Sequence, residues 1–158
     1  MPDVIRPATL HDAIQAWAIR REAVLAQCAR HYPMPDLIRW TEGELPSSYA
    51  ELVAKCFHVV ERDGAVIATG TVNLDSGQLD AIFVASRHSG QGVGKAIMNH
   101  LEQLARQQGL GVLTLKATLN AAPFYRRCGF VGEAVSEYCS PRGISLACVP
   151  MQKSLAEG

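Results

Sequence analysis

The chain has 158 residues, of which 48% are apolar, and its 15 basic side chains balance 15 acidic ones. A chain of this length and composition can bury a core without disulfides or a metal, so we expect residues 1–158 to form a single domain. Because the formal net charge is zero, no overall field favours nucleic acid or an anionic membrane surface as a partner.

The cysteine pattern and the N-terminus indicate a soluble protein of the cytoplasm. The five cysteines are widely spaced and form neither a CxxC pair nor a zinc-type ladder, which predicts reduced thiols and no metal site. Residues 1–10 carry Asp3 and Arg6 where a secretory signal needs an apolar run. No stretch of about 18 apolar residues, the length of a membrane span, occurs anywhere.

A short strand and a helix are expected first. Residues 4–9 read as the strand, and Thr9 is suited to cap a helix whose first turn contains Asp12. Apolar side chains then recur roughly at helical spacing as far as Cys28. Prolines between residues 33 and 49 exclude a long helix there, so we expect one short helical turn around residues 37–40.

Three consecutive antiparallel strands are expected next. The β-rich runs 57–61 and 65–72 flank Asp63-Gly64, a dipeptide suited to the positive φ of a tight hairpin turn. A second break at residues 75–77 leads into the run 78–84.

The clearest helix begins after the loop Ser89-Gly90-Gln91-Gly92-Val93-Gly94. Apolar residues recur at spacings of three and four from Val93 to Ala105, and Gly109 ends the helix. Residues 112–115 form a short apolar strand, which we expect to lie buried and parallel to its neighbour. Strand, loop, helix and strand in this order predict a βαβ unit.

A short helix at 120–128 and two strands at 130–138 and 144–151 complete the order. The elements predict an α+β fold of the three-layer α/β type, with a mixed, mostly antiparallel central sheet of about six to seven strands flanked by helices. A homodimer through the last strands is left open.

The glycine loop predicts a phosphate site. Alternating glycines let backbone N–H groups converge at a helix start, where the helix dipole favours an anion, although a plain chain reversal is the alternative. A Walker loop aligned on Gly94-Lys95 would need glycine at Ser89 and a hydroxyl at Ala96. The dinucleotide pattern would need glycine at Lys95 or Ile97, so neither motif fits.

A second constellation consists of Asn120 and Phe124-Tyr125-x-x-x-Gly129-Phe130. With the glycine loop and the strand before it, this constellation resembles the GNAT superfamily of acetyltransferases. The opening Ile5-Arg6-Pro7-Ala8, followed by Asp12, is also similar to the start of that superfamily. The element order matches over roughly residues 4–151, and the specific motifs lie between residues 79 and 130.

The resemblance implies direct transfer of acetyl from acetyl-CoA to a primary amine of a small molecule, protein or peptide. It implies that the backbone of Phe83 and Val84 pairs with the pantetheine arm, that Asn120 contacts this arm, and that an N–H near Val84 binds the thioester oxygen. Tyr125 would donate a proton to the departing thiolate. The pyrophosphate would lie on Ser89, Gly90, Gln91, Gly92, Val93, Gly94 and Lys95.

The loop departs from the family pattern at one position. The family begins this loop with Gln or Arg, where Ser89 stands here. Arg87 satisfies the pattern if the register shifts by two residues, but the distance from Val84 and the phase of the helix favour Ser89. We expect a weaker phosphate contact with the backbone cradle retained.

Acetyl transfer also needs a proton donor and a proton acceptor. Tyr125, a phenol of pKa about 10, can protonate a thiolate with help from a non-aqueous site, or it packs beside Phe124 as core. Asp80 is the candidate base, since we expect it to share a strand face with Ile82 and Val84; a solvated carboxylate is the alternative. Weaker candidates are Glu61, His58 and Glu137, whereas His88 and His100 are expected to be solvated.

For most of the remaining polar candidates a functional and a structural interpretation are both open. Arg126 and Arg127 either contact the 3′-phosphate side of the cofactor or form a solvated face, and Cys128 is expected to be a buried structural thiol. The segment 29–54 would border the acceptor, and its aromatic and acidic residues either receive a cationic amine or cover the core: Tyr32, Trp40, Tyr49, Glu42 and Glu44. The rival function is a CoA-binding sensor or interaction module without turnover, suggested by Ser89 and the lack of an obvious base.

Overall fold

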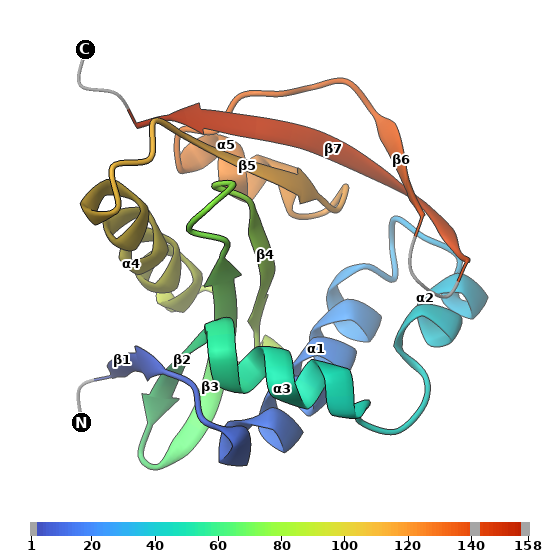
Figure 1. Ribbon diagram of the computed structural model, residues 1–158. Helices are drawn as coiled ribbons and strands as arrows, with labels where there is room; N and C mark the ends of the chain where they lie inside the picture. The colour runs from blue at the N-terminus through green and yellow to red at the C-terminus, as the bar shows by residue number, and fades with distance from the viewer. Residues whose placement is uncertain (1–2, 140–142, 156–158) are drawn as a thin grey trace.

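The computed structural model contains two β-sheets that meet at one point and then diverge (Figure 1). It describes residues 3–139 and 143–155. The first sheet is antiparallel and has the order β1 (Val4–Pro7), β2 (Phe57–Arg62), β3 (Ala65–Val72), β4 (Leu79–Val84). The second has the order β5 (Val112–Ala117), β7 (Ser145–Ser154), β6 (Ser136–Cys139) and is also antiparallel.

Helices cover both faces of the first sheet. They are α1 (Ala13–Gln27), α2 (Met34–Thr41), α3 (Ser47–Cys56), α4 (Val93–Gln107) and α5 (Ala122–Arg127). Helices α1 and α3 pack on one face, α4 packs on the other, and α5 lies near the second sheet (Figure 1). The predicted α+β class with helices around a mostly antiparallel sheet is confirmed, but the sheet is divided into two parts.

Local sequence signals explain the best-predicted elements. Asp63 and Gly64 both have positive φ, 52° and 81°, as the tight turn between β2 and β3 requires. The apolar stripe of α4 is buried against β3, and its buried residues are Val93, Ile97, Met98, Leu101 and Ala105. These two elements place the glycine loop beside the end of β4.

The N-terminal segment is held by a partly buried ion pair. Asp12 accepts the Thr9 N–H at 2.7 Å and pairs with Arg6 at 2.8 Å, while Arg6 also reaches Glu61 at 2.8 Å. Thr9 therefore caps a single 3₁₀ turn, Leu10–Asp12, and α1 begins after it. The cap that the sequence predicts also anchors β1 to β2.

The prolines of the segment 33–49 exclude a long helix, as predicted, but they begin two short ones. Pro33 precedes α2 and Pro46 precedes α3, where the missing N–H has no intrahelical role. The sequence predicted one short turn here, so α3 was missed.

The neighbours of β5 also differ from the prediction. This strand pairs antiparallel with β7 along its whole length and touches β4 through one parallel bridge, between Thr114 and Gln78. Residues 130–135 make one isolated bridge, from Val131 to Gln152, and β6 begins later than predicted. Most of the predicted turn, residues 140–142, lies outside the described residues.

Candidate functional site

Strands β4 and β5 are in close contact at their beginnings and then separate. The Thr114 N–H donates to the Gly77 carbonyl at 3.0 Å, next to the bridge with Gln78. Gly77 has φ +80°, and a Cβ there would lie 2.4 Å from the Val112 carbonyl oxygen. Only glycine permits this approach, which fixes the point from which the two strands diverge.

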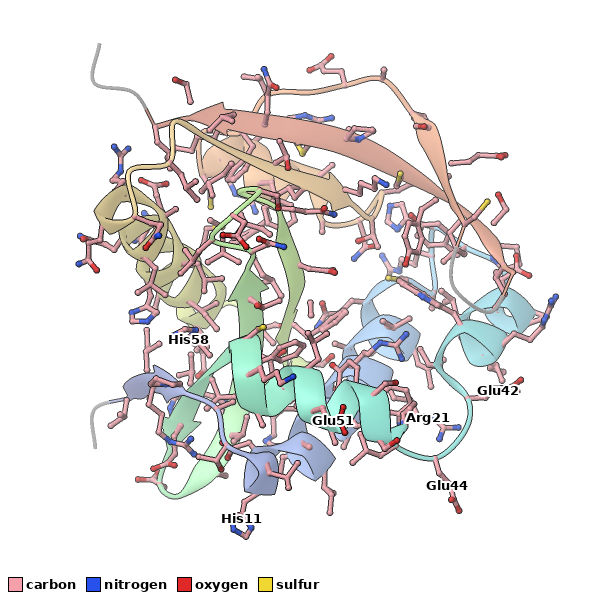
Figure 2. All side chains as sticks on the ribbon, viewed as in Figure 1. His11, Arg21, Glu42, Glu44, Glu51 and His58 are labelled. Carbon is pink, nitrogen blue, oxygen red and sulfur yellow. The ribbon has the colours of Figure 1, made fainter. Side chains whose placement is uncertain are left out.

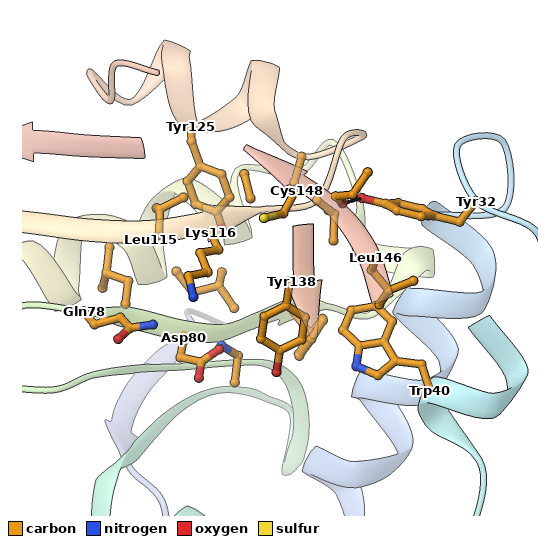
Figure 3. A pocket seen from close by; sticks show the side chains of 18 residues that line it. Tyr32, Trp40, Gln78, Asp80, Leu115, Lys116, Tyr125, Tyr138, Leu146 and Cys148 are labelled. Carbon is orange, nitrogen blue, oxygen red and sulfur yellow. Dashed lines mark hydrogen bonds between the residues drawn. The ribbon is translucent and has the colours of Figure 1, made fainter. Parts of the chain in front are cut away.

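The divergence opens a pocket of about 160 Å³ between the two sheets (Figure 3). One wall is β4 and the other is β5, and side chains from α5, β6 and β7 close the space. The polar and aromatic side chains that line it are Tyr32, Trp40, Gln78, Asp80, Phe83, Lys116, Thr118, Tyr125 and Tyr138. The structure therefore brings the predicted acid and base to one pocket.

A bulge in β4 shapes this wall. Asp80 lies opposite Thr71 and Phe83 lies opposite Thr69, so two residues of β4 face Gly70 alone. The first of them, Ala81, has φ 54°, which is costly for a residue with a Cβ. The Asp80 carboxylate accepts the Ala81 N–H at 2.8 Å, and the Thr69 hydroxyl donates to the Ala81 carbonyl at 2.9 Å. Both polar groups of the strained residue are thereby satisfied.

The bulge overturns one prediction about Asp80. Because the extra residue shifts the alternation of side chains, Asp80 shares a face with Phe83, whereas Leu79 and Val84 share the other face. The expectation that Asp80 shares a face with Ile82 and Val84 is therefore wrong. Asp80 nevertheless lines the pocket.

Tyr125 enters the pocket from α5 and is only 9% exposed. Its ring packs edge-on against Phe124 and Phe130, with centroids 5.2 and 5.9 Å away. Burial raises the pKa of Tyr125, and the nearby Cys128 and Asp80 raise it further. The phenol therefore keeps its proton at neutral pH. The charge of the Asp80 carboxylate acts on it because both side chains line the same pocket.

Asn120 lies in the loop between β5 and α5. Its side-chain oxygen is buried and has no hydrogen-bond partner within the described part of the chain. A buried acceptor without a partner costs about 1–3 kcal/mol, so this oxygen is suited to receive an N–H from a ligand.

The glycine loop presents free N–H groups at the start of α4. Gly90 and Gly92 have φ +78° and +81°, and a Cβ at either would meet no atom within 4 Å. Gly92 is the N-cap, and Ala96 N–H bonds back to the Gly92 carbonyl at 3.0 Å. The N–H groups of the first turn, before Ala96, have no acceptor within the helix, as an anion site requires.

A polar cluster ties this loop to the β2–β3 hairpin. The Arg62 guanidinium donates to the Gln91 side-chain oxygen at 2.6 Å and lies 3.1 Å from His88 Nδ1. Arg87 donates to the other nitrogen of His88 at 3.2 Å. His88 is thus half-buried in the cluster and not solvated as predicted, and no local sequence signal pointed to Arg62.

The carbonyl of Val84 already has a partner. The Gln27 side chain, at the end of α1, donates to it at 3.0 Å, and Glu22 accepts the Ser86 N–H at 2.8 Å. Sequence reasoning missed both α1 residues, because their contacts join segments far apart in the chain.

The weaker base candidates lie elsewhere. Glu61 pairs with Arg6, and Glu137 is exposed on β6. His58, on β2 (Figure 2), lies beside His100, with ring centroids 5.1 Å apart, and burial lowers the pKa of both. His100 is therefore not solvated as predicted, and none of these side chains lines the pocket.

Two of the predicted acceptor-side residues line the pocket, Tyr32 and Trp40. The Tyr32 hydroxyl donates to the Ala147 carbonyl and accepts the Leu119 N–H at 2.9 Å, so it ties β7 to the end of β5. Tyr49 packs against Trp17 and Phe57 outside the pocket, and burial raises its pKa to about 12. The exposed Glu42 and Glu44 point outward from the loop after α2 (Figure 2).

The basic residues of α5 do not line the pocket. Arg126 donates to the Gly132 carbonyl at 3.2 Å, and Arg127 is exposed. Cys128 packs against the core, and burial raises the pKa of its thiol, which agrees with a structural role. In residues 3–139 and 143–155, no group of three or more His, Cys, Asp or Glu side chains could hold a metal ion. No helix within these residues is long and apolar enough to cross a bilayer.

Comparison with known proteins gives the family of this fold. The model of the Acetyltransferase (GNAT) family matches residues 13–130. The chain belongs to this family. The chain is 31% identical over 97 residues to streptothricin acetyltransferase of Streptomyces lavendulae, a match that covers 57% of this chain and 51% of that one. The chain spans about half the length of the curated relatives it matches.

Solved structures agree with the GNAT fold. A GCN5-related N-acetyltransferase from Rhodopseudomonas palustris superposes with a TM-score of 0.88 at 23% identity, covering 98% of this chain and 97% of that one. The PaiA N-acetyltransferase of Thermoplasma acidophilum, solved in complex with coenzyme A, gives 0.78 at 15% identity and covers 98% and 99%. The predicted family and fold are confirmed.

Proposed function

We propose that this GNAT protein transfers the acetyl group of acetyl-CoA directly to a primary amine of a small molecule, protein or peptide. One observation carries the proposal: β4 and β5 separate into a pocket that contains both Asp80 and Tyr125, beside a helix start with free N–H groups. The family membership of the chain supports the same reaction.

The residues present fit the donor. Acetyl-CoA carries a pyrophosphate, an amide-containing arm and a thioester whose carbonyl carbon is open to attack. The open N–H groups of the glycine loop would bind the pyrophosphate, and the unpartnered oxygen of Asn120 would accept an N–H of the arm. Backbone groups on the free side of β4, at Val84, would bind the arm and the thioester oxygen.

Two side chains would move the protons. Asp80 would accept a proton from the acceptor's ammonium group, directly or through water, which leaves the neutral amine that attacks. As the new C–N bond forms and the C–S bond breaks, Tyr125 would donate its proton to the sulfur, and the second proton of the attacking nitrogen would return, directly or through water, to the Tyr125 phenolate. The raised pKa of Tyr125 ensures that the proton is present at neutral pH.

Calorimetric titration with acetyl-CoA tests donor binding. Gly92 has φ +81°, a conformation that Asn and Asp tolerate better than other residues, so Gly92→Asn and Gly92→Asp are a matched pair that differs in charge. Asp at a helix N-cap stabilises the helix but repels phosphate. We expect Gly92→Asn to bind more weakly than the wild type and Gly92→Asp to lose binding. Absence of binding by the folded wild type would overturn the proposal.

Turnover separates the enzyme from the rival sensor. Thiol release would be followed with a panel of primary amines at saturating acetyl-CoA. An N-acetyltransferase releases CoA faster with at least one amine than by background hydrolysis. A sensor or interaction module binds acetyl-CoA and shows no release above that background.

A further inference from the structure

The pocket contains one side chain of each charge. Asp80, on β4, is the sole carboxylate and Lys116, on β5, is the sole cation among its described lining residues. Figure 3 shows the two side chains extending into the pocket from opposite walls. Within the described residues neither belongs to an ion pair: the recorded hydrogen bond of Asp80 goes to the Ala81 N–H, and Lys116 has an aromatic neighbour.

Lys116 is held where it can meet a ligand. Its neighbours along β5, Leu115 and Ala117, are buried, whereas Lys116 is exposed; all three line the pocket, and Lys116 is the charged one among them. The ammonium lies 5.7 Å from the centre of the Tyr138 ring. This cation–π contact orients the ammonium and leaves its N–H donors without a carboxylate partner.

The positive charge of Lys116 disfavours the binding of a simple amine. An acceptor amine enters as an ammonium ion, and a like charge in the same small pocket repels it. Asp80 attracts the ammonium, but it cannot neutralise both cations. An acceptor with its own anionic group removes the conflict, because each end then meets the opposite charge.

Apart from Gln78 and Thr118, most of the remaining wall is apolar or aromatic. Phe83, Trp40, Leu146 and Tyr138 surround the two charged groups. These side chains suit an apolar or aromatic body.

We infer that the acceptor is a small amino acid-like molecule, with a primary amine facing Asp80, a carboxylate facing Lys116 and an apolar body between the aromatic walls. The inference rests on the proposed function, whose acceptor it specifies. Lys116 is thus a specificity residue that binds the acceptor's carboxylate.

Two acceptors that differ by a carboxylate test the inference. Phenylalanine and 2-phenylethylamine would be compared by thiol release with the wild type, Lys116→Met and Lys116→Arg. Lys116→Met keeps the apolar stem and removes the charge, and Lys116→Arg keeps the charge. A charge-assisted hydrogen bond leads us to expect that Lys116→Met lowers the ratio of kcat/KM for phenylalanine over phenylethylamine about tenfold or more. Lys116→Arg is expected to retain most of the ratio.

A charge reversal adds a second readout. Lys116→Glu is expected to favour a diamine, such as 1,5-diaminopentane, over phenylalanine, because both of its ends then meet carboxylates. If plain amines are acetylated and none of the substitutions changes the ratio, the inference is overturned while the proposed function stands. The same holds if the wild type turns over plain amines but no amino acid with an apolar side chain. If the folded wild type bound no acetyl-CoA or acetylated none of the amines, the proposed function itself would be overturned.

Discussion

The hydroxyl of Thr69 donates a hydrogen bond of 2.9 Å to the carbonyl of Ala81, the strained residue of the β4 bulge. Thr69→Val keeps the shape of the side chain and removes this bond. We expect the free energy of unfolding to fall by about 1 kcal/mol, as measured by urea denaturation, and kcat to fall because the bulge positions Asp80.

Thr71→Val is the matched control for Thr69. Thr71 lies on the same strand and flanks the bulge, but its hydroxyl donates to the Cys56 carbonyl, also at 2.9 Å, and not to a bulged residue. It is expected to lose similar stability with less effect on kcat. Equal effects of the two variants on kcat would show that the Thr69 bond has no special influence on the pocket.

Asp80→Asn separates the two roles of this side chain. The amide oxygen can still accept the Ala81 N–H, but the neutral side chain no longer acts as a base. We expect kcat/KM to fall about 100-fold at neutral pH with stability retained. Asp80→Ala is expected to lose both activity and about 1 kcal/mol of stability. An Asp80→Asn enzyme with wild-type kcat/KM would exclude Asp80 as the base.

Tyr125→Phe tests the proton donor. The ring contacts with Phe124 and Phe130 remain, so the variant should fold and bind acetyl-CoA like the wild type. We expect kcat to fall by about 10² to 10⁴. Because the pKa of Tyr125 lies above its ordinary value of 10.0, the wild-type rate should show no decline from this group below pH 10.0.

The control for Tyr125 is Tyr49→Phe, which removes a buried hydroxyl that has no hydrogen-bond partner among the described residues and lies outside the pocket. This variant is expected to keep its activity. Equal kcat for Tyr125→Phe and wild type would exclude the phenol as the acid.

Gln27→Met tests the free edge of β4. The Gln27 side-chain amide donates a hydrogen bond to the Val84 carbonyl. Under the proposed function, the arm of acetyl-CoA would bind at this same carbonyl. If binding replaces that bond, its removal should lower the Kd for acetyl-CoA about two- to tenfold, as measured by calorimetry. Gln15→Met, which breaks a 2.9 Å bond between α1 and the Val66 N–H, should leave Kd unchanged. A weaker Kd for Gln27→Met would mean that Gln27 helps to build the donor site.

The Arg6–Asp12 pair predicts how stability depends on pH. The Arg6 hydrogen bonds, opposed by burial and aided by the Thr9 N–H, hold the pKa of Asp12 below its ordinary value of 3.8. The pair therefore stabilises the fold above pH 3.8, and its contribution is lost as the pH falls through the lower, folded value. Urea denaturation over this range should show a smaller loss of stability for Asp12→Asn than for the wild type. Parallel curves would show that Asp12 does not cause the acid loss.

Local signals explain what could be predicted. Asp63-Gly64 and the glycine loop were predicted because positive φ at these positions depends on residues next to one another, and the fold class and family are confirmed. No glycine marks the bulge at Ala81, so the face of Asp80 was predicted wrongly. The antiparallel pairing of β5 with β7 depends on a distant strand, which local patterns do not specify.

Among the site residues too, those with a local sequence signal were predicted and the others were not. Tyr125 was predicted from the family motif and Asp80 from an alternation that the bulge interrupts, although both line the pocket. No local signal pointed to Lys116 in an apolar strand or to Gln27 in a helix. The roles of the site residues, the single domain over residues 1–158, the cytoplasmic location and a homodimer stay predictions.

Beyond the point where β4 separates from β5, the side of β4 that faces β5 is an unpaired sheet edge inside the molecule. An outer edge of this kind invites strand addition by other polypeptides and hence aggregation. Here the second sheet is joined to the first at Gln78–Thr114, so this edge lines a pocket between the sheets. A thin molecule that carries amides can still use the edge as an additional strand would. Under the proposed function, an edge that would otherwise invite aggregation becomes the place where the amide-containing arm of the donor binds.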